Sequence, residues 1–313
     1  MFTDTNEASS TPPTDNPGAL FSRAKANGLL TANTTLLFLA ILTGVGGGLG
    51  AVAFRWLIRS FHTAFFDGGA TAFSFMGPYY TIVLPVLGGL IIGPLINKFA
   101  PETKGSGVPE IMDAVAMHGG FIRPRVAVIK SLAASICIGS GGSVGREGPI
   151  GQIGAALGAT FAGLLRLSEG RTRTLVACAV AAGIAATFNA PIGGAFFALE
   201  LILGRWTAEA FAPVVVASVT ASAIGRAVFG DVPAFAVPAY GIASFTELPA
   251  FLILGLLTAP IAVAFIRLLT LAEDFFARFP VPPWLLPAVG GILMGFIGMY
   301  DHSLYGVGYG KIQ

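Results

Sequence analysis

Long apolar runs without a charged residue alternate with short polar segments along this chain. A helix that crosses a membrane needs about 20 predominantly apolar residues. Some runs reach that length, and others are shorter or are interrupted by glycine and proline. The pattern predicts an all-α polytopic membrane protein with several helices too short or too broken for simple spans. The uncharged runs cover residues 36–54, 69–97, 131–145, 148–165, 174–199, 210–225, 248–266 and 279–300.

The composition supports a membrane protein. Of the 313 residues, 54% are hydrophobic and 11% are charged, whereas a soluble domain is usually about 25% charged. The net charge of +2 is spread without a lysine or arginine block, so we expect no nucleic-acid partner. Cys137 and Cys178 lie inside apolar runs and lack metal-ligand spacing. We therefore expect buried thiols, no metal site and no cofactor.

Residues 1–34 are polar and rich in Ser, Thr, Pro and Asn. They contain no apolar core typical of a signal peptide. We expect a polar N-terminal tail ahead of a multi-pass protein of the cell membrane, plasma or inner. Arg23 and Lys25 before the first apolar run favour a cytoplasmic N-terminus, and Arg55 and Arg59 after it oppose that orientation.

A ten-residue segment occurs twice. LPVLGGLIIG at 84–93 returns as LPAVGGILMG at 286–295, at an offset of 202 and with five of ten positions identical. Two fainter echoes flank it in the same order, at offsets of 211 and 201. Internal repeats are common in transporters, often with the binding site at the repeat interface.

These echoes divide the chain into a first transmembrane repeat at 35–235, a linker at 236–248 and the start of a second repeat at 249–313. The second repeat lacks counterparts of the later part of the first. We therefore expect the chain to be a fragment that lacks about 120 residues of a two-repeat membrane domain.

Three stretches place glycine or a cap-type residue just before a proline: KGSGVP at 104–109, GREGP at 145–149 and FNAP at 188–191. Proline is favoured at the first position of a helix, so each stretch predicts a helix start. A helix N-terminus carries free N–H groups and about +0.5 of an elementary charge, which in lipid must face protein, water or an anion. Several such N-termini aimed at one point predict an anion site.

Arg146 and Glu147 stand together between two uncharged runs. A charge at the centre of a membrane helix costs about 2.5–3.5 kcal/mol on insertion scales. We therefore expect the two charged side chains to have a function that offsets this cost. Glu147 at a helix start is itself an anion, so we expect it to occupy the position of a permeating anion. Protonation would neutralise the carboxylate and free that position. The sequence therefore predicts that Glu147 is a gate and a proton carrier. Ser106 adds a hydroxyl donor, and Arg146 adds positive potential. The alternatives are a plain N-cap for Glu147, an ion-pair partner or interfacial side chain for Arg146, and an ordinary cap for Ser106.

The motifs GSGVPEI (105–111), GREGP (145–149) and GIAATFNAPIGGAFFALE (183–200) together resemble the CLC family of chloride channels and chloride/proton exchangers. The resemblance extends over about residues 35–313. It implies an all-helical fold of two inverted repeats with tilted, partly re-entrant helices. It also implies a homodimer in membrane lipid, in which each subunit has its own pore for chloride.

The resemblance gives roles to residues of these motifs. Ser106 matches the chloride-coordinating serine, and its identity favours chloride over nitrate, for which the family uses proline. Glu147 matches the gating glutamate that blocks the pore and passes protons, and Arg146 occupies the neighbouring basic position. Backbone N–H groups beside these side chains are expected to help bind the anion; they belong to Gly105, Gly107, Gly145 and Gly148.

One position departs from the family pattern. Exchangers of the family usually carry an internal proton-transfer glutamate directly after the position of Glu200, and Leu201 stands there in this chain. Glu200 is the candidate for an internal proton path, with a charge at a helix end as the alternative. Both a channel and an exchanger remain open at this point.

Two other functions compete with anion transport. The stretch GSGGSVGREG at 139–148 is glycine-rich like a phosphate-binding loop, but it lacks the Gly-Lys-Ser/Thr ending and a strand-loop-helix context. We therefore expect no enzyme. A non-conducting structural or regulatory membrane fragment is the alternative function, and reconstituted anion flux would exclude it.

Overall fold

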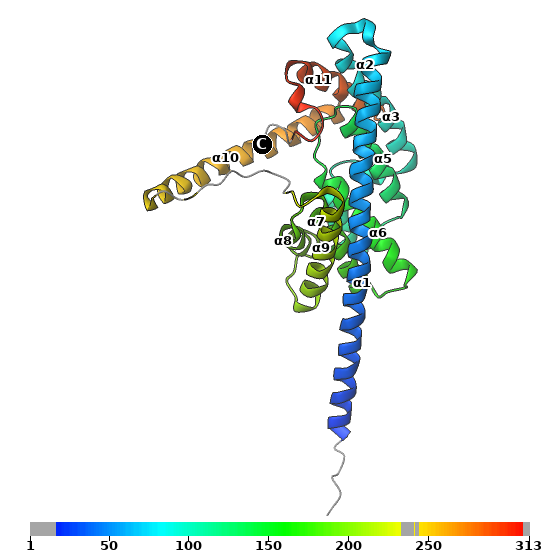
Figure 1. Cartoon of the computed structure of the whole chain (residues 1–313), viewed down its shortest axis with the longest axis vertical. Helices are drawn as coiled ribbons and strands as arrows, with labels where there is room; N and C mark the ends of the chain where they lie inside the picture. Colours follow the sequence, from blue (N-terminus) through cyan, green and yellow to red (C-terminus); the bar gives the residue numbers. More distant parts are fainter. Residues whose placement is uncertain (1–16, 233–240, 242–243, 309–313) are drawn as a thin grey trace, which may run out of the picture.

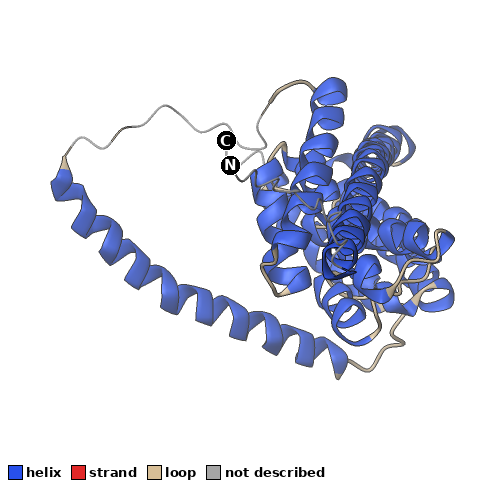
Figure 2. Cartoon of the chain, turned by 90° about the horizontal axis from the view of Figure 1, so that it is seen from below, coloured by secondary structure: helices blue, strands red, loops and turns tan. Residues whose placement is uncertain are grey.

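The computed structural model describes residues 17–232, 241 and 244–308, with side chains described from residue 34 onward (Figure 1). The described residues are helical and contain no strand, which confirms the predicted all-α fold (Figure 2). Helix α1 begins at Pro17, inside the predicted polar tail. The rest of that tail and most of the predicted linker at 236–248 lie outside the described residues.

The α-helices are α1 (Pro17–His62), α2 (Gly68–Ala72), α3 (Tyr80–Phe99), α4 (Val108–Met117), α5 (Arg125–Gly139), α6 (Glu147–Leu164), α7 (Glu169–Phe188), α8 (Pro191–Phe197), α9 (Ala208–Phe229), α10 (Leu248–Ala277) and α11 (Leu286–Tyr300). Short 3-10 helices are η2 (Ser74–Tyr79), η3 (Pro101–Thr103), η5 (Phe245–Glu247) and η6 (His302–Leu304). Two π-helical segments are η1 (Thr63–Asp67) and η4 (Ala198–Leu203).

Helix α7 forms the centre of the bundle, where α1, α6 and α9 pack around it. Its run LVACAVAAGIAA is made of small and apolar residues that are buried. Small residues let helix backbones approach closely in a membrane protein. Gly154 of α6 accordingly faces the carbonyl oxygen of Ala179, and Gly47 of α1 faces the side chain of Ala182. This core holds α6, and with it Glu147, in a fixed position.

The two copies of the repeated segment pack against each other, the first in α3 and the second in α11. Gly89 of α3 meets the backbone of Pro287, and Gly291 of α11 meets the backbone of Pro85. Pro287 and Gly291 are the counterparts of Pro85 and Gly89 at the offset of 202. The contacts run in opposite directions along the two helices, so the copies are antiparallel and related by an approximate two-fold axis. Two further contacts between α3 and the segment around α11 follow the same antiparallel order: Gly93 against Trp284 and Gly295 against Ile82.

Among the residues that the structure describes, four helical segments are long and apolar enough to cross a membrane: Thr34–Ala72, Ser74–Phe99, Ala208–Phe229 and Phe245–Ala277. Helix α4 has 10 residues and α5 has 15, so both are shorter than a simple span, as the broken apolar runs predict. Helix α10 projects from the bundle as a separate arm in both views, and none of its residues is buried (Figures 1 and 2).

Candidate anion site

Two of the predicted helix starts meet in the structure. Helix α4 begins at Val108 after Gly107, and α6 begins at Glu147. The α-carbon of Gly148 lies directly against the carbonyl oxygen of Ser106. A side chain at position 148 would overlap that oxygen, so glycine permits the two N-termini to come together. The contact joins the motifs GSGVP and GREGP, which are about 40 residues apart in the sequence.

A cavity of about 580 Å³ lies where these helix starts meet. Ser106 and Glu147 are both exposed and both line it. Among the predicted glycines, three line the cavity, and Gly107 instead lies behind it against Gln152 of α6. The lining residues are Ile92, Ile96, Thr103, Lys104, Gly105, Ser106, Val108, Lys130, Ala133, Ala134, Cys137, Val144, Gly145, Glu147, Gly148 and Pro149.

The side chain of Glu147 folds back over Gly145, towards the N-terminal end of its own helix. Side chains of an α-helix lean towards the helix N-terminus, so this direction follows from the backbone. The carboxylate consequently lies where the free N–H groups and the positive end of the helix dipole attract an anion. Gly145 leaves the space that the carboxylate occupies, because a side chain there would collide with it.

Lys130 is a residue of the site that the sequence analysis did not single out. It lies on α5, is only 5% exposed and lines the same cavity. Its Nζ donates hydrogen bonds to the carbonyl oxygens of Thr103 at 2.9 Å and Gly105 at 2.8 Å. A buried charge requires such partners. The signal was present in the sequence, because Lys130 is the single charged residue between Arg125 and Arg146.

Arg146 points away from the cavity. It is 9% exposed, and its guanidinium carbon lies 5.2 Å from the ring centroid of Phe188, at the C-terminal end of α7. A cation over an aromatic face at this distance is attracted to it. Arg146 is therefore anchored to the bundle core, and its contribution at the cavity comes from the backbone that leads into α6.

The third predicted helix start lies elsewhere. Helix α8 begins at Pro191 after the left-handed residue Asn189, and none of residues 188–194 lines the cavity. This end packs against α9: Ser218 donates to the carbonyl oxygen of Pro191 at 2.6 Å, and Arg226 donates to the Asn189 side chain at 2.7 Å. Among the described residues, the N-termini of α4 and α6 therefore meet at the cavity, and the N-terminus of α8 does not.

Glu200 is exposed in the π-helical segment η4 and does not line the cavity of Ser106 and Glu147. Leu201, beside it, lines a separate cavity of about 270 Å³ together with Arg173 and Arg205. The surroundings of Leu201 are therefore apolar and basic, without a carboxylate among the residues that line this cavity.

Residues 88–313 match the family described as "Voltage gated chloride channel". A ClcB-like protein of Ralstonia nicotianae is 32% identical over 89% of the chain and 66% of its own length. The H(+)/Cl(-) exchange transporter ClcA of Vibrio cholerae is 33% identical over 78% of the chain and 53% of its own length.

The crystal structure of a slow cyanobacterial Cl-/H+ antiporter superposes with a TM-score of 0.75 at 25% identity, over 87% of this chain and 65% of that one. A CLC-type fluoride/proton antiporter superposes with a TM-score of 0.71 at 24% identity, over 86% and 66%. The chain thus spans about two thirds or less of the length of these relatives.

Proposed function

The chain belongs to the voltage gated chloride channel family, and we propose that it carries chloride across the cell membrane through a pathway gated by Glu147. Ser106 and the backbone N–H groups of Gly105, Gly145 and Gly148 bind the anion, and Gly107, behind the cavity, precedes the first residue of α4. The backbone of Arg146 leads into the N-terminus of α6 in this proposal, and its side chain is anchored on Phe188 outside the cavity. Chloride, protons, membrane lipid and a second copy of the chain are the expected partners.

The observation that carries the proposal is the shared cavity of Ser106 and Glu147. A hydroxyl donor and a carboxylate border one space, at the meeting point of two helix N-termini. These N-termini favour one negative charge. The Lys130 ammonium adds a full positive charge to the same wall. An anion and the ionised Glu147 therefore compete for one electrostatic site.

This competition produces gating. Ionised Glu147 satisfies the N-terminus of α6 and excludes chloride from it. Protonation removes the negative charge, so the side chain loses its attraction to the helix end and an anion takes its place. Binding by partial charges is strong enough to admit an ion and weak enough to release it.

The relatives described as an H(+)/Cl(-) exchange transporter and a Cl-/H+ antiporter support proton movement coupled to chloride. Leu201 lies in an apolar and basic cavity, which opposes an internal proton site at that position. Glu200, exposed beside it, is the carboxylate that an internal proton path would use.

Liposomes with a chloride gradient test the function. Chloride efflux and external pH are recorded together, with the membrane potential clamped at a value that cannot itself drive protons. Chloride efflux with uphill proton movement supports an exchanger, and chloride efflux alone supports a channel. Liposomes that release no chloride would contradict transport and support a non-conducting structural or regulatory role.

A further inference from the structure

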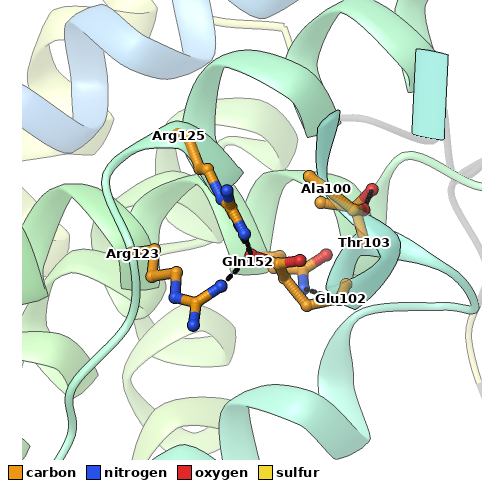
Figure 3. Close-up of polar contacts among 6 residues, drawn as sticks. All are labelled: Ala100, Glu102, Thr103, Arg123, Arg125 and Gln152. Carbon is orange, nitrogen blue, oxygen red and sulfur yellow. Dashed lines mark hydrogen bonds and ion pairs between the residues drawn. The ribbon is translucent and has the colours of Figure 1, made fainter. Parts of the chain in front are cut away.

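The short segment before Ser106 is tied to two helices by one carboxylate and three carbonyl groups. Glu102, in η3, accepts hydrogen bonds from Arg125 Nε at 3.1 Å and Arg125 Nη2 at 3.0 Å (Figure 3). Arg123 Nη1 lies 3.6 Å from the same carboxylate oxygen. Arg125 opens α5, the helix that also carries Lys130. The carboxylate therefore fastens η3 to the N-terminal end of α5.

The backbone of the same segment makes a second set of contacts. Gln152 Nε2 donates to the carbonyl oxygen of Glu102 at 3.4 Å, as Figure 3 shows. Gln152 lies on α6, five positions after Glu147, and is 3% exposed. The Lys130 bonds to the carbonyl oxygens of Thr103 and Gly105 complete the set. Residues 102–105 thus bridge α5 and the helix that begins with Glu147.

Ser106 stands between two glycines that both adopt left-handed backbone conformations. Gly105 has φ +80° and Gly107 has φ +97°, a region that glycine enters at no steric cost. Two glycines around one residue leave its direction undetermined by the local backbone. Contacts further along the chain must fix where the Ser106 hydroxyl points.

We propose that Glu102 is a positioning residue for anion binding, which sets the place of Ser106 relative to Glu147 through Arg125, Arg123 and Gln152. The inference rests on the proposed function, because it takes Ser106 to be the anion ligand. Glu102 does not line the cavity of Ser106, so its action is indirect. It lines a neighbouring cavity of about 740 Å³ together with Pro101 and Gln152.

The position of the ion pair predicts an effect on binding rather than on stability. The side chain of Glu102 is 31% exposed and that of Arg125 is 49% exposed. Ion pairs at such exposed sites contribute little to folding. Loss of the pair is therefore expected to move Ser106 while the bundle stays folded, which separates a positioning role from a purely structural one.

Chloride binding to the purified protein in detergent, measured by calorimetry, tests the proposal. Glu102→Gln is expected to weaken binding by about tenfold, equivalent to one hydrogen-bonded contact, with the thermal unfolding midpoint unchanged. Glu102→Arg with Arg125→Glu reverses the pair and is expected to recover binding to within about threefold. Hydrogen exchange at residues 103–108 is expected to rise in Glu102→Gln and to return in the reversed pair.

Two further variants make the outcomes distinct. Asp113→Asn removes an exposed carboxylate that lines the same neighbouring cavity and pairs with His118 at 3.3 Å, and it is expected to leave binding unchanged. Ser106→Ala tests the anion ligand itself. Weaker binding in Ser106→Ala with normal binding in Glu102→Gln would overturn the positioning role and leave the proposed function standing. An absence of chloride binding in the unaltered protein would overturn both.

Discussion

The α-carbon of Gly148 lies against the carbonyl oxygen of Ser106, with no side chain between the two helix starts. This contact sets how close the α4 and α6 N-termini come, and hence how much of their positive potential overlaps in the cavity. The potential of a helix end falls off within about one turn. A small separation of the two starts would therefore weaken the site for a chloride ion.

Gly148→Ala is expected to weaken chloride binding by about tenfold and to destabilise the protein by about 1–3 kcal/mol, since the added methyl overlaps the Ser106 oxygen. Calorimetry and thermal unfolding measure the two effects. Gly151→Ala on the same helix is the control, because its methyl would make ordinary contacts at 3.6 Å with Ile111 and 3.9 Å with Val180. Equal binding in the two variants would contradict a role for the close approach.

The antiparallel contact of the repeated segments gives a second prediction. Gly291→Ala is expected to destabilise the protein by about 1–3 kcal/mol, because its methyl would lie 2.5 Å from the carbonyl oxygen of Pro85. The adjacent Gly290→Ala meets nothing within 4 Å and is expected to be neutral or to stabilise by up to about 1 kcal/mol. Thermal unfolding in detergent compares them, and equal midpoints would exclude the contact seen between α3 and α11.

Glu147→Gln is expected to give chloride flux that hardly changes between about pH 5 and pH 8, because the amide resembles the protonated carboxyl group and cannot titrate. Proton movement is expected to be absent. Flux assays in liposomes across this pH range check the result. Glu169→Gln is the matched control, because Glu169 also lies in the first turn of a helix, α7, and does not line the cavity. A pH dependence unchanged in Glu147→Gln would contradict the gate.

Much of the fold and part of the site follow from local sequence rules. The apolar runs and the proline-marked starts give the helices, since each depends on neighbouring residues alone. The repeat of LPVLGGLIIG identifies two equivalent segments in the sequence, and the structure shows that they pair as α3 and α11. Ser106 and Glu147 were predicted as one site because both motifs place a polar side chain at a helix start.

The remaining features depend on tertiary packing. Nothing in the spacing of FNAP distinguishes a helix start that faces a cavity from one that packs on α9. The direction of Arg146 depends on the position of Phe188 at the end of α7. Lys130 and Glu102 bind carbonyl groups and arginines that are 21 to 27 residues away in the sequence. These groups become neighbours because the fold places η3 against both α5 and α6.

The arginines around Glu102 give a pH prediction with a definite sign. Burial by itself raises the pKa of Glu102, but its backbone hydrogen bond, the hydrogen bond and charge of Arg125 and the charge of Arg123 outweigh burial and lower this pKa. A carboxyl group with a lowered folded-state pKa stabilises the folded arrangement above its unfolded value, near 4.3, and loses that contribution as the pH falls through the folded-state pKa. The tie to α5 is therefore complete at neutral pH.

Chloride binding in Glu147→Gln, where the gate does not titrate, is accordingly expected to be constant from about pH 8 down to pH 5 and to weaken only below about pH 4. Adding Glu102→Gln is expected to remove this acid-side loss and to leave binding weak at every pH. Glu110, Asp113 and His118 line the same neighbouring cavity. Glu110→Gln and Asp113→Asn in the Glu147→Gln background are therefore the controls for the neighbouring carboxylates, and His118→Gln is the control for the imidazole. The prediction assigns the acid-side loss to Glu102, because protonation of this carboxyl group releases Arg125 from η3. An acid-side loss that survives Glu102→Gln and disappears in one of the controls would contradict this assignment and place the titrating group at that neighbour.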